Sequence, residues 1–208
     1  MKEKTLYRMF MFQLLYGFSI PRFEDFLYLY YTSPDYSNFS QLQYGIIRLS
    51  TIVGVLCGIT AYNLFLKHTS IRAVIIVSQI LYIIQTVGHI LFVKRITFGL
   101  NPFVYAFVLE MTSESFLFAF NSMPLMSTVA KLIPHSVEST IFGFFTGLNI
   151  LFMFVISKII GNLINIYFKV DKESLDDLWK LYIVQILGIM VSMCFVWLLP
   201  TPAQVKRV

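Results

Sequence analysis

Five ionisable side chains fall inside long apolar stretches of this 208-residue sequence. A charge within the hydrocarbon of a membrane costs about 2.5–3.5 kcal/mol even on a gentle insertion scale, so such a side chain usually faces a cavity or an opposite charge. Asp25 follows Pro21 by one helical turn, so the two residues share a helix face. Glu110 and Glu114 are also one turn apart and share a face of another helix. The five residues are Asp25, Arg48, Glu110, Glu114 and Lys158.

These side chains have the chemistry of a polar path through a membrane. Asp25 or Glu110 could take up and release a proton, and Arg48 or Lys158 could neutralise an anionic solute. The alternative is structural, because the same residues could form internal ion pairs or extend toward a membrane surface. The sequence alone leaves both interpretations open.

Other polar and aromatic residues are interpreted as structural. Arg22 and Glu24 are placed near the outer rim of the membrane, and His89 is taken as a packed polar residue. Tyr28–Tyr31 is typical of the aromatic belts found at membrane surfaces. The sequence has no hydrolase elbow, metalloprotease motif or P-loop, and no His or Cys spacing typical of a metal site. We therefore expect neither an enzyme nor a bound metal or cofactor.

The elements that would hold these residues are helices in a lipid bilayer. Hydrophobic residues make up 57% of the chain, charged residues only 13%, and the mean hydropathy is +0.74. Soluble domains carry roughly 25% charged residues. The net charge of +5 comes from Lys and Arg spread along the chain, mainly near segment ends, so it does not indicate a nucleic-acid partner. We predict an all-α membrane protein.

Apolar runs of about 20 residues, the length that crosses a bilayer, predict six transmembrane helices in one domain over residues 1–208. Pro21 and Pro124 fall inside two of these runs, where each removes a backbone hydrogen bond and should kink the helix. The predicted helices are Leu6–Tyr31, Tyr44–Leu66, Ile71–Val93, Phe103–Leu132, Thr140–Phe168 and Leu178–Leu199.

Lys and Arg are more numerous on the membrane side that would hold both termini. Cytoplasmic segments carry such an excess, so we expect a multi-pass protein with both termini in the cytoplasm. The glycosylation sequon Asn38–Ser40 falls in the first loop on the opposite side, which agrees with this orientation.

Three stretches carry a succession of short motifs. Pro21–Asp25 reads Pro-Arg-Phe-Glu-Asp, and Tyr62–Lys67 reads Tyr-Asn-Leu-Phe-Leu-Lys. Met123–Phe142 begins with Met-Pro, continues with Ala-Lys-Leu-Ile-Pro and ends with Glu-Ser-Thr-Ile-Phe. Their order and spacing resemble the folate–biopterin transporter family of the major facilitator superfamily. The resemblance covers nearly the whole chain but only helices seven to twelve of such transporters.

This resemblance implies half of a major-facilitator fold. Glu110 falls where the family carries an Asp in helix ten, and Asn149 falls where it commonly has Ser-Asn, while Lys131 and Ser139 replace its usual Arg and Ala. In that fold the substrate site lies near the midplane between two six-helix halves. The implied partner is a second half, either covalent in a longer chain or supplied by a homodimer.

The function implied by the resemblance is alternating-access transport of folate, biopterin or a related pteridine solute. Proton coupling through Asp25 and Glu110 is a further hypothesis. Two alternatives stay open: transport of another small metabolite, and a non-transporting membrane protein that is a remnant of a transporter or assembles with a partner.

Overall fold

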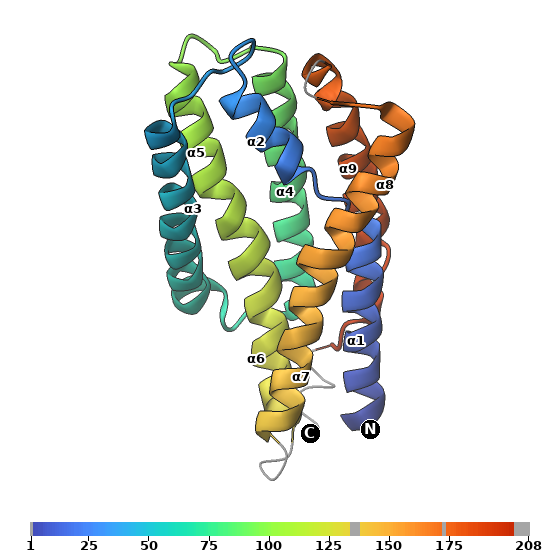
Figure 1. Cartoon of the computed structure of the whole chain (residues 1–208). Helices are drawn as coiled ribbons and strands as arrows, with labels where there is room; N and C mark the ends of the chain where they lie inside the picture. The colour runs from blue at the N-terminus through green and yellow to red at the C-terminus, as the bar shows by residue number, and fades with distance from the viewer. Residues whose placement is uncertain (1, 134–137, 172–173, 202–208) are drawn as a thin grey trace.

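Long helices account for almost all of the described chain in the computed structural model (Figure 1). The structure describes residues 2–133, 138–171 and 174–201, without the side chains at 2–3, 114–118 and 138. The described residues contain no strand, which confirms the all-helical prediction. The α-helices are α1 (Lys2–Ser19), α2 (Glu24–Thr32), α3 (Gln41–Ala61), α4 (Ile71–Val93), α5 (Pro102–Glu114), α6 (Met123–Leu132), α7 (Glu138–Ile150), α8 (Ser157–Phe168) and α9 (Leu178–Met193).

Short segments of other helix types join or extend these helices. Three are π-helical, with one extra residue in the hydrogen-bonded turn, and they continue α3, α5 and α7. Two are 3₁₀-helices that flank α9. The π-helical segments are η1 (Tyr62–Leu66), η2 (Ser115–Ser122) and η4 (Leu151–Ile156), and the 3₁₀-helices are η5 (Leu175–Asp177) and η6 (Val196–Leu198).

Four helical stretches among the described residues are long and apolar enough to cross a membrane. Each lies close to one of the helices predicted from the sequence, because a run of about 20 apolar residues is a strong signal of a membrane span. Serine caps define two of their starts: Ser40 accepts a hydrogen bond from the Gln43 amide at 3.2 Å, and Ser70 accepts one from the Ala73 amide at 3.4 Å. The stretches are Gln41–Leu66, Ile71–Val93, Ser139–Phe168 and Leu175–Leu198.

The predicted helix Leu6–Tyr31 is interrupted in the structure. Residues 20–23 are non-helical, and in Figure 1 the chain leaves α1, crosses sideways and continues upward in α2 on a displaced axis. The kink expected at Pro21 is therefore a full break, since proline cannot donate a backbone hydrogen bond and disfavours a helical residue before it. In the predicted helix Phe103–Leu132, the segment before Pro124 is the π-helical η2.

Two clusters of buried apolar residues fill the bundle, one toward each end. The cluster at the α2 end is rich in aromatic rings: the ring of Tyr31 lies 5.6 Å from that of Phe39 and 5.5 Å from that of Phe92. Tyr30 and Tyr31 are each 2% exposed, so the interpretation of Tyr28–Tyr31 as a surface belt is wrong for these two residues. Their hydroxyls find partners inside the bundle, which allows the rings to be buried.

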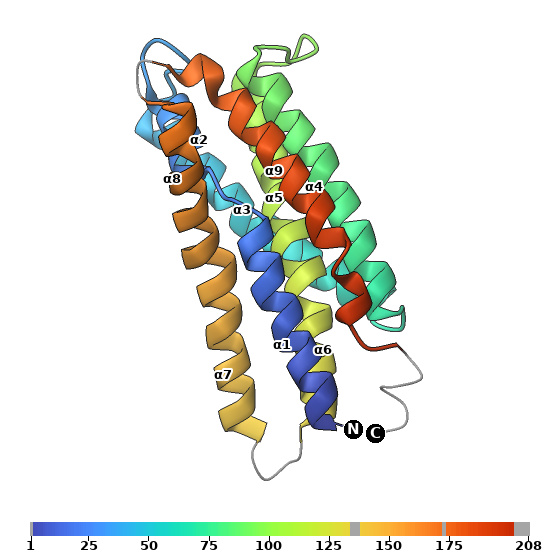
Figure 2. The ribbon, with the colours of Figure 1, turned by 90° about the vertical axis from the view of Figure 1, so that its right-hand side faces the viewer.

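The break between α1 and α2 is enclosed by α8 and α9, which flank α1 in Figure 2. Two glycines permit this close approach. A Cβ atom at Gly161 would overlap the carbonyl oxygen of Arg22, and one at Gly188 would overlap the carbonyl oxygen of Ser19. Membrane helices approach closely where small residues leave the backbone uncovered.

Alanine at Gly161 or Gly188 should lower the free energy of unfolding by about 1–3 kcal/mol, because the added methyl group has no space. The matched control is Gly147→Ala on α7, where a Cβ atom would meet nothing within 4 Å. Unfolding of the full chain by SDS in mixed micelles, followed by circular dichroism, measures the differences. Equal stability of all three variants would show that α8 and α9 do not contact the break closely.

Candidate functional site

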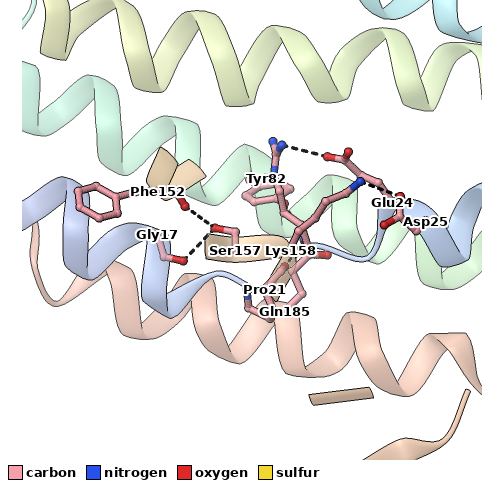
Figure 3. A network of polar contacts seen from close by, with 10 residues as sticks. Gly17, Pro21, Glu24, Asp25, Tyr82, Phe152, Ser157, Lys158 and Gln185 are labelled. Atoms are coloured by element: carbon pink, nitrogen blue, oxygen red, sulfur yellow. Dashed lines mark hydrogen bonds and ion pairs between the residues drawn. The ribbon is translucent and has the colours of Figure 1, made fainter. Parts of the chain in front are cut away.

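The break between α1 and α2 is held by polar contacts from α8 and α9 (Figure 3). The Gln185 side-chain amide donates a hydrogen bond to the carbonyl oxygen of Pro21 at 3.0 Å. The backbone amide of Arg22 donates to the carbonyl oxygen of Ser157 at 3.1 Å, and the Ser157 hydroxyl donates to the carbonyl oxygen of Gly17 at 2.8 Å. These hydrogen bonds fix the backbone around Arg22 and so set the direction of its side chain.

The Arg22 side chain is buried, with only 5% of its surface exposed. Its Nη1 atom lies 3.0 Å from Oε1 of Glu24, and its guanidinium lies 4.6 Å from the centre of the Phe154 ring. A buried guanidinium is tolerated when a carboxylate and an aromatic face replace its hydration. The break therefore brings a fixed positive charge into the interior of the bundle.

Arg22 and Glu24 line a cavity together with Arg48 and Glu110. The cavity volume is about 40 Å³, room for a few water molecules in this conformation. A smaller cavity of about 20 Å³ shares Glu24, Leu27, Arg48 and Glu110 with it, so the two adjoin along these walls. We call these two spaces the charged cavity. Two cations and two carboxylates thus surround one space between helices that are otherwise apolar. The other walls of the larger space are Phe23, Leu27, Tyr82, His89, Ser113, Tyr182 and Gln185.

The charged cavity also has acceptors and an aromatic surface. Glu110 is 8% exposed, and its Oε1 accepts a hydrogen bond from the Tyr31 hydroxyl at 3.0 Å. The His89 ring stacks on the Tyr182 ring, with centroids 5.3 Å apart and an interplanar angle of 10°. Nδ1 of His89 has no hydrogen-bond partner among the described residues. The arrangement can bind a polar solute by ion pairing, by hydrogen bonding and by ring contact.

Asp25 and Lys158 lie outside this cavity. Nζ of Lys158 lies 2.7 Å from Oδ1 of Asp25, and the two side chains are 39% and 59% exposed. Of the residues singled out from the sequence, the structure therefore joins Arg48 and Glu110 in one cavity, and Asp25 and Lys158 in a separate ion pair on the bundle surface.

Asn149 belongs to a different polar cluster. It is 4% exposed, and its amide donates a hydrogen bond to the Ser122 hydroxyl at 3.2 Å. The adjacent Asn121 donates to the Tyr16 hydroxyl. Asn149 does not line the charged cavity. Glu114 ends α5, and its side chain lies outside the described part of the chain.

A sequence profile of the BT1 family matches residues 1–208. The chain belongs to the BT1 family. Together with the four apolar helical stretches, this membership identifies a multi-pass membrane protein. No solved structure matches the chain.

Curated relatives of this BT1-family chain are named as folate or folate-biopterin transporters. Probable folate-biopterin transporters 2 and 6 of Arabidopsis thaliana are 26% and 27% identical, over 85% and 83% of this chain and 36% and 35% of their own length. Folate transporter 1 of Plasmodium falciparum (isolate 3D7) is 23% identical over 91% of this chain and 37% of its own length. The chain thus spans about a third of the length of the relatives it matches.

The cavity also includes Arg22 and Glu24, which the sequence places near the membrane rim in a structural role. Arg22 is buried and pairs with Glu24, and both line the cavity. The sequence signal for including Arg22 is its position, because it lies farther from the predicted helix end at Tyr31 than Asp25 does. His89, interpreted as a packed residue, is buried as expected but also lines the cavity.

A double-mutant cycle with Arg22→Met and Glu24→Gln should give a coupling energy of about 1–3 kcal/mol, because the pair is removed from water on the arginine side. The matched control is the pair Lys180 and Asp177, 2.8 Å apart with both side chains at least 40% exposed. That pair should give about 0.5 kcal/mol or less. SDS unfolding of the full chain measures both cycles, and equal coupling would contradict the buried pairing of Arg22.

Proposed function

We propose that this chain is one six-helix half of an alternating-access transporter for folate, biopterin or a related pteridine solute. The observation that carries the proposal is the charged cavity, in which two cations and two carboxylates lie among apolar helices. Ionisable groups at this depth in a membrane protein mark solute or ion pathways. The transporter names of the curated relatives support the substrate class.

The groups around the cavity suit a flat, anionic solute. Arg48 is exposed and forms no ion pair with a described residue, so its guanidinium is available for a solute carboxylate. The carboxylate of Glu110 can accept hydrogen bonds from ring N–H groups. The stacked rings of His89 and Tyr182 offer a surface for ring contact. A pteridine with an acidic tail would therefore find partners of suitable chemistry on this wall once a second half completes and widens the cavity.

The six-helix count extends the four apolar stretches by two interrupted spans. We count α1 with α2 as one span and α5, η2 and α6 as another. The first turn of α1 and η6 lie at the same end of the bundle in Figure 2, as an even number of crossings requires. The distribution of Lys and Arg favours the cytoplasm for that end.

A second six-helix half would cover the charged groups that this chain leaves exposed. Three charged side chains are exposed on helices that we propose to span the membrane: Arg48, Asp25 and Lys158. Lipid is a poor environment for them, whereas a polar cavity wall of a partner is a good one. The partner is either a covalent half of a longer chain or a second copy of this one.

We also propose that Glu110 carries a coupled proton. Its carboxylate is buried and accepts a hydrogen bond from Tyr31 at 3.0 Å, so gain or loss of a proton would change the charge balance of the cavity. Asp25 is the weaker candidate, because its carboxylate is exposed and paired with Lys158.

Arg48→Ala should lower uptake of radiolabelled folate at low substrate concentration by about tenfold, because a charge-assisted contact to the solute is lost. Glu110→Gln should remove the dependence of uptake on an imposed pH gradient. The control is Lys94→Gln, at the C-terminal end of α4 and outside the cavity lining, which should leave both properties unchanged. Uptake is measured in membrane vesicles that hold the complete transporter. Full activity of both cavity variants would contradict these roles.

Detection of the native protein through its C-terminus, in membranes of the source cells, tests the half-transporter proposal. We expect a band near twice the 24.1 kDa of this chain, or a band at 24.1 kDa that cross-links into a dimer. A 24.1 kDa chain that neither dimerises nor supports uptake would overturn the proposal and favour a non-transporting protein.

A further inference from the structure

A second cavity lies between η1, the start of α4 and α6, away from the charged cavity. Its volume is about 240 Å³, and no residue lines both this cavity and the charged one. Polar side chains from the α3–α4 connection and from α6 surround it. We call it the basic cavity, and its polar walls include Lys67, His68, Ser70, Ser127, Thr128 and Lys131.

The charged side chains among the described residues that line the basic cavity are lysines. Lys67 comes from the connection after η1, and Lys131 comes from the last turn of α6. Neither lysine forms an ion pair with a described residue, and no carboxylate is among the described residues that line the cavity. Two cations that line one space, with no carboxylate among its described lining residues, favour an anionic ligand.

The other walls supply hydrogen-bonding groups and apolar surface. The hydroxyls of Ser127 on α6 and of Ser70 at the start of α4 line the cavity, while the Thr128 hydroxyl donates a hydrogen bond to the carbonyl oxygen of Pro124 at 2.8 Å. Tyr62 and Ile71, 6% and 8% exposed, add apolar lining. An oxyanion with several acceptor oxygens matches several hydroxyl and ammonium donors at once, and phosphate is such a group.

The cavity lies where two apolar helical stretches meet their connecting loop. The apolar stretch that contains α3 ends at Leu66, and the stretch formed by α4 begins at Ile71. Ends of membrane-spanning helices lie near the lipid headgroups, and basic pockets between such helices bind phosphate-bearing headgroups. We propose that the basic cavity binds a phosphomonoester, carried by an anionic lipid headgroup or by a free phosphate compound. This site is separate from the proposed solute pathway.

The test measures binding by the purified full chain in neutral detergent, with three probes: short-chain phosphatidic acid, short-chain phosphatidylcholine and inorganic phosphate. Native mass spectrometry over a series of probe concentrations counts the bound molecules and gives the affinities. The test variant carries Lys67→Gln and Lys131→Gln. The matched control carries Lys94→Gln and Lys169→Gln, which remove the same charge at the opposite ends of α4 and α8.

We expect the test variant to bind phosphatidic acid about tenfold more weakly, because charge-assisted contacts are lost, and the control to bind it unchanged. A third variant with arginine at both positions should retain binding, which separates loss of charge from loss of fold. If inorganic phosphate competes with phosphatidic acid, the phosphate of the natural ligand belongs to a free phosphate compound. If it does not compete, the phosphate belongs to a lipid headgroup. Equal loss in test and control variants, or equal affinity for phosphatidylcholine, would overturn the proposal.

Discussion

An interrupted helix leaves backbone groups unpaired, and a buried backbone group is stable only when it finds a hydrogen-bond partner. At the break after Ser19, two helices from the far end of the chain supply such partners. The Ser157 carbonyl accepts a hydrogen bond from the Arg22 amide, and the Gln185 amide donates one to the Pro21 carbonyl. Glycines on α8 and α9 allow the approach. The same contacts bring the Arg22 side chain inward, so the charged cavity depends on them.

This dependence explains which parts of the fold the sequence predicts. The helix Ile71–Val93 has the same ends in prediction and structure, because its length and its flanking charges and turn residues are local signals. The break at Pro21 is not a local property. Proline predicts a disturbed helix, but whether the helix bends or ends depends on donors and acceptors more than 130 residues away. Single-sequence reasoning has no access to that contact.

The candidate site was predictable in its chemistry and less so in its geometry. Glu110 and Arg48 were identified from their depth in apolar runs, and they share a cavity. Asp25 was identified in the same way, yet it points to the bundle surface and pairs with Lys158. Hydropathy reports how deep a residue lies along a helix. Which side of that helix faces the interior depends on the packing of the other helices. After an interruption such as residues 20–23, the helix continues on a new axis, so a different set of positions faces the interior.

The two arginines of the cavity have separable roles. The guanidinium of Arg22 is buried, pairs with Glu24 and covers Phe154, so a solute that used it would have to break an internal ion pair. Arg48 is exposed, lies 6.0 Å from the Tyr44 ring and forms no ion pair with a described residue, so it can bind an anion without that loss. Breaking a pair in a low-dielectric interior is costly. In the proposed transporter, Arg48 therefore contacts the solute, while Arg22 keeps the cavity neutral and its walls in place when no solute is bound.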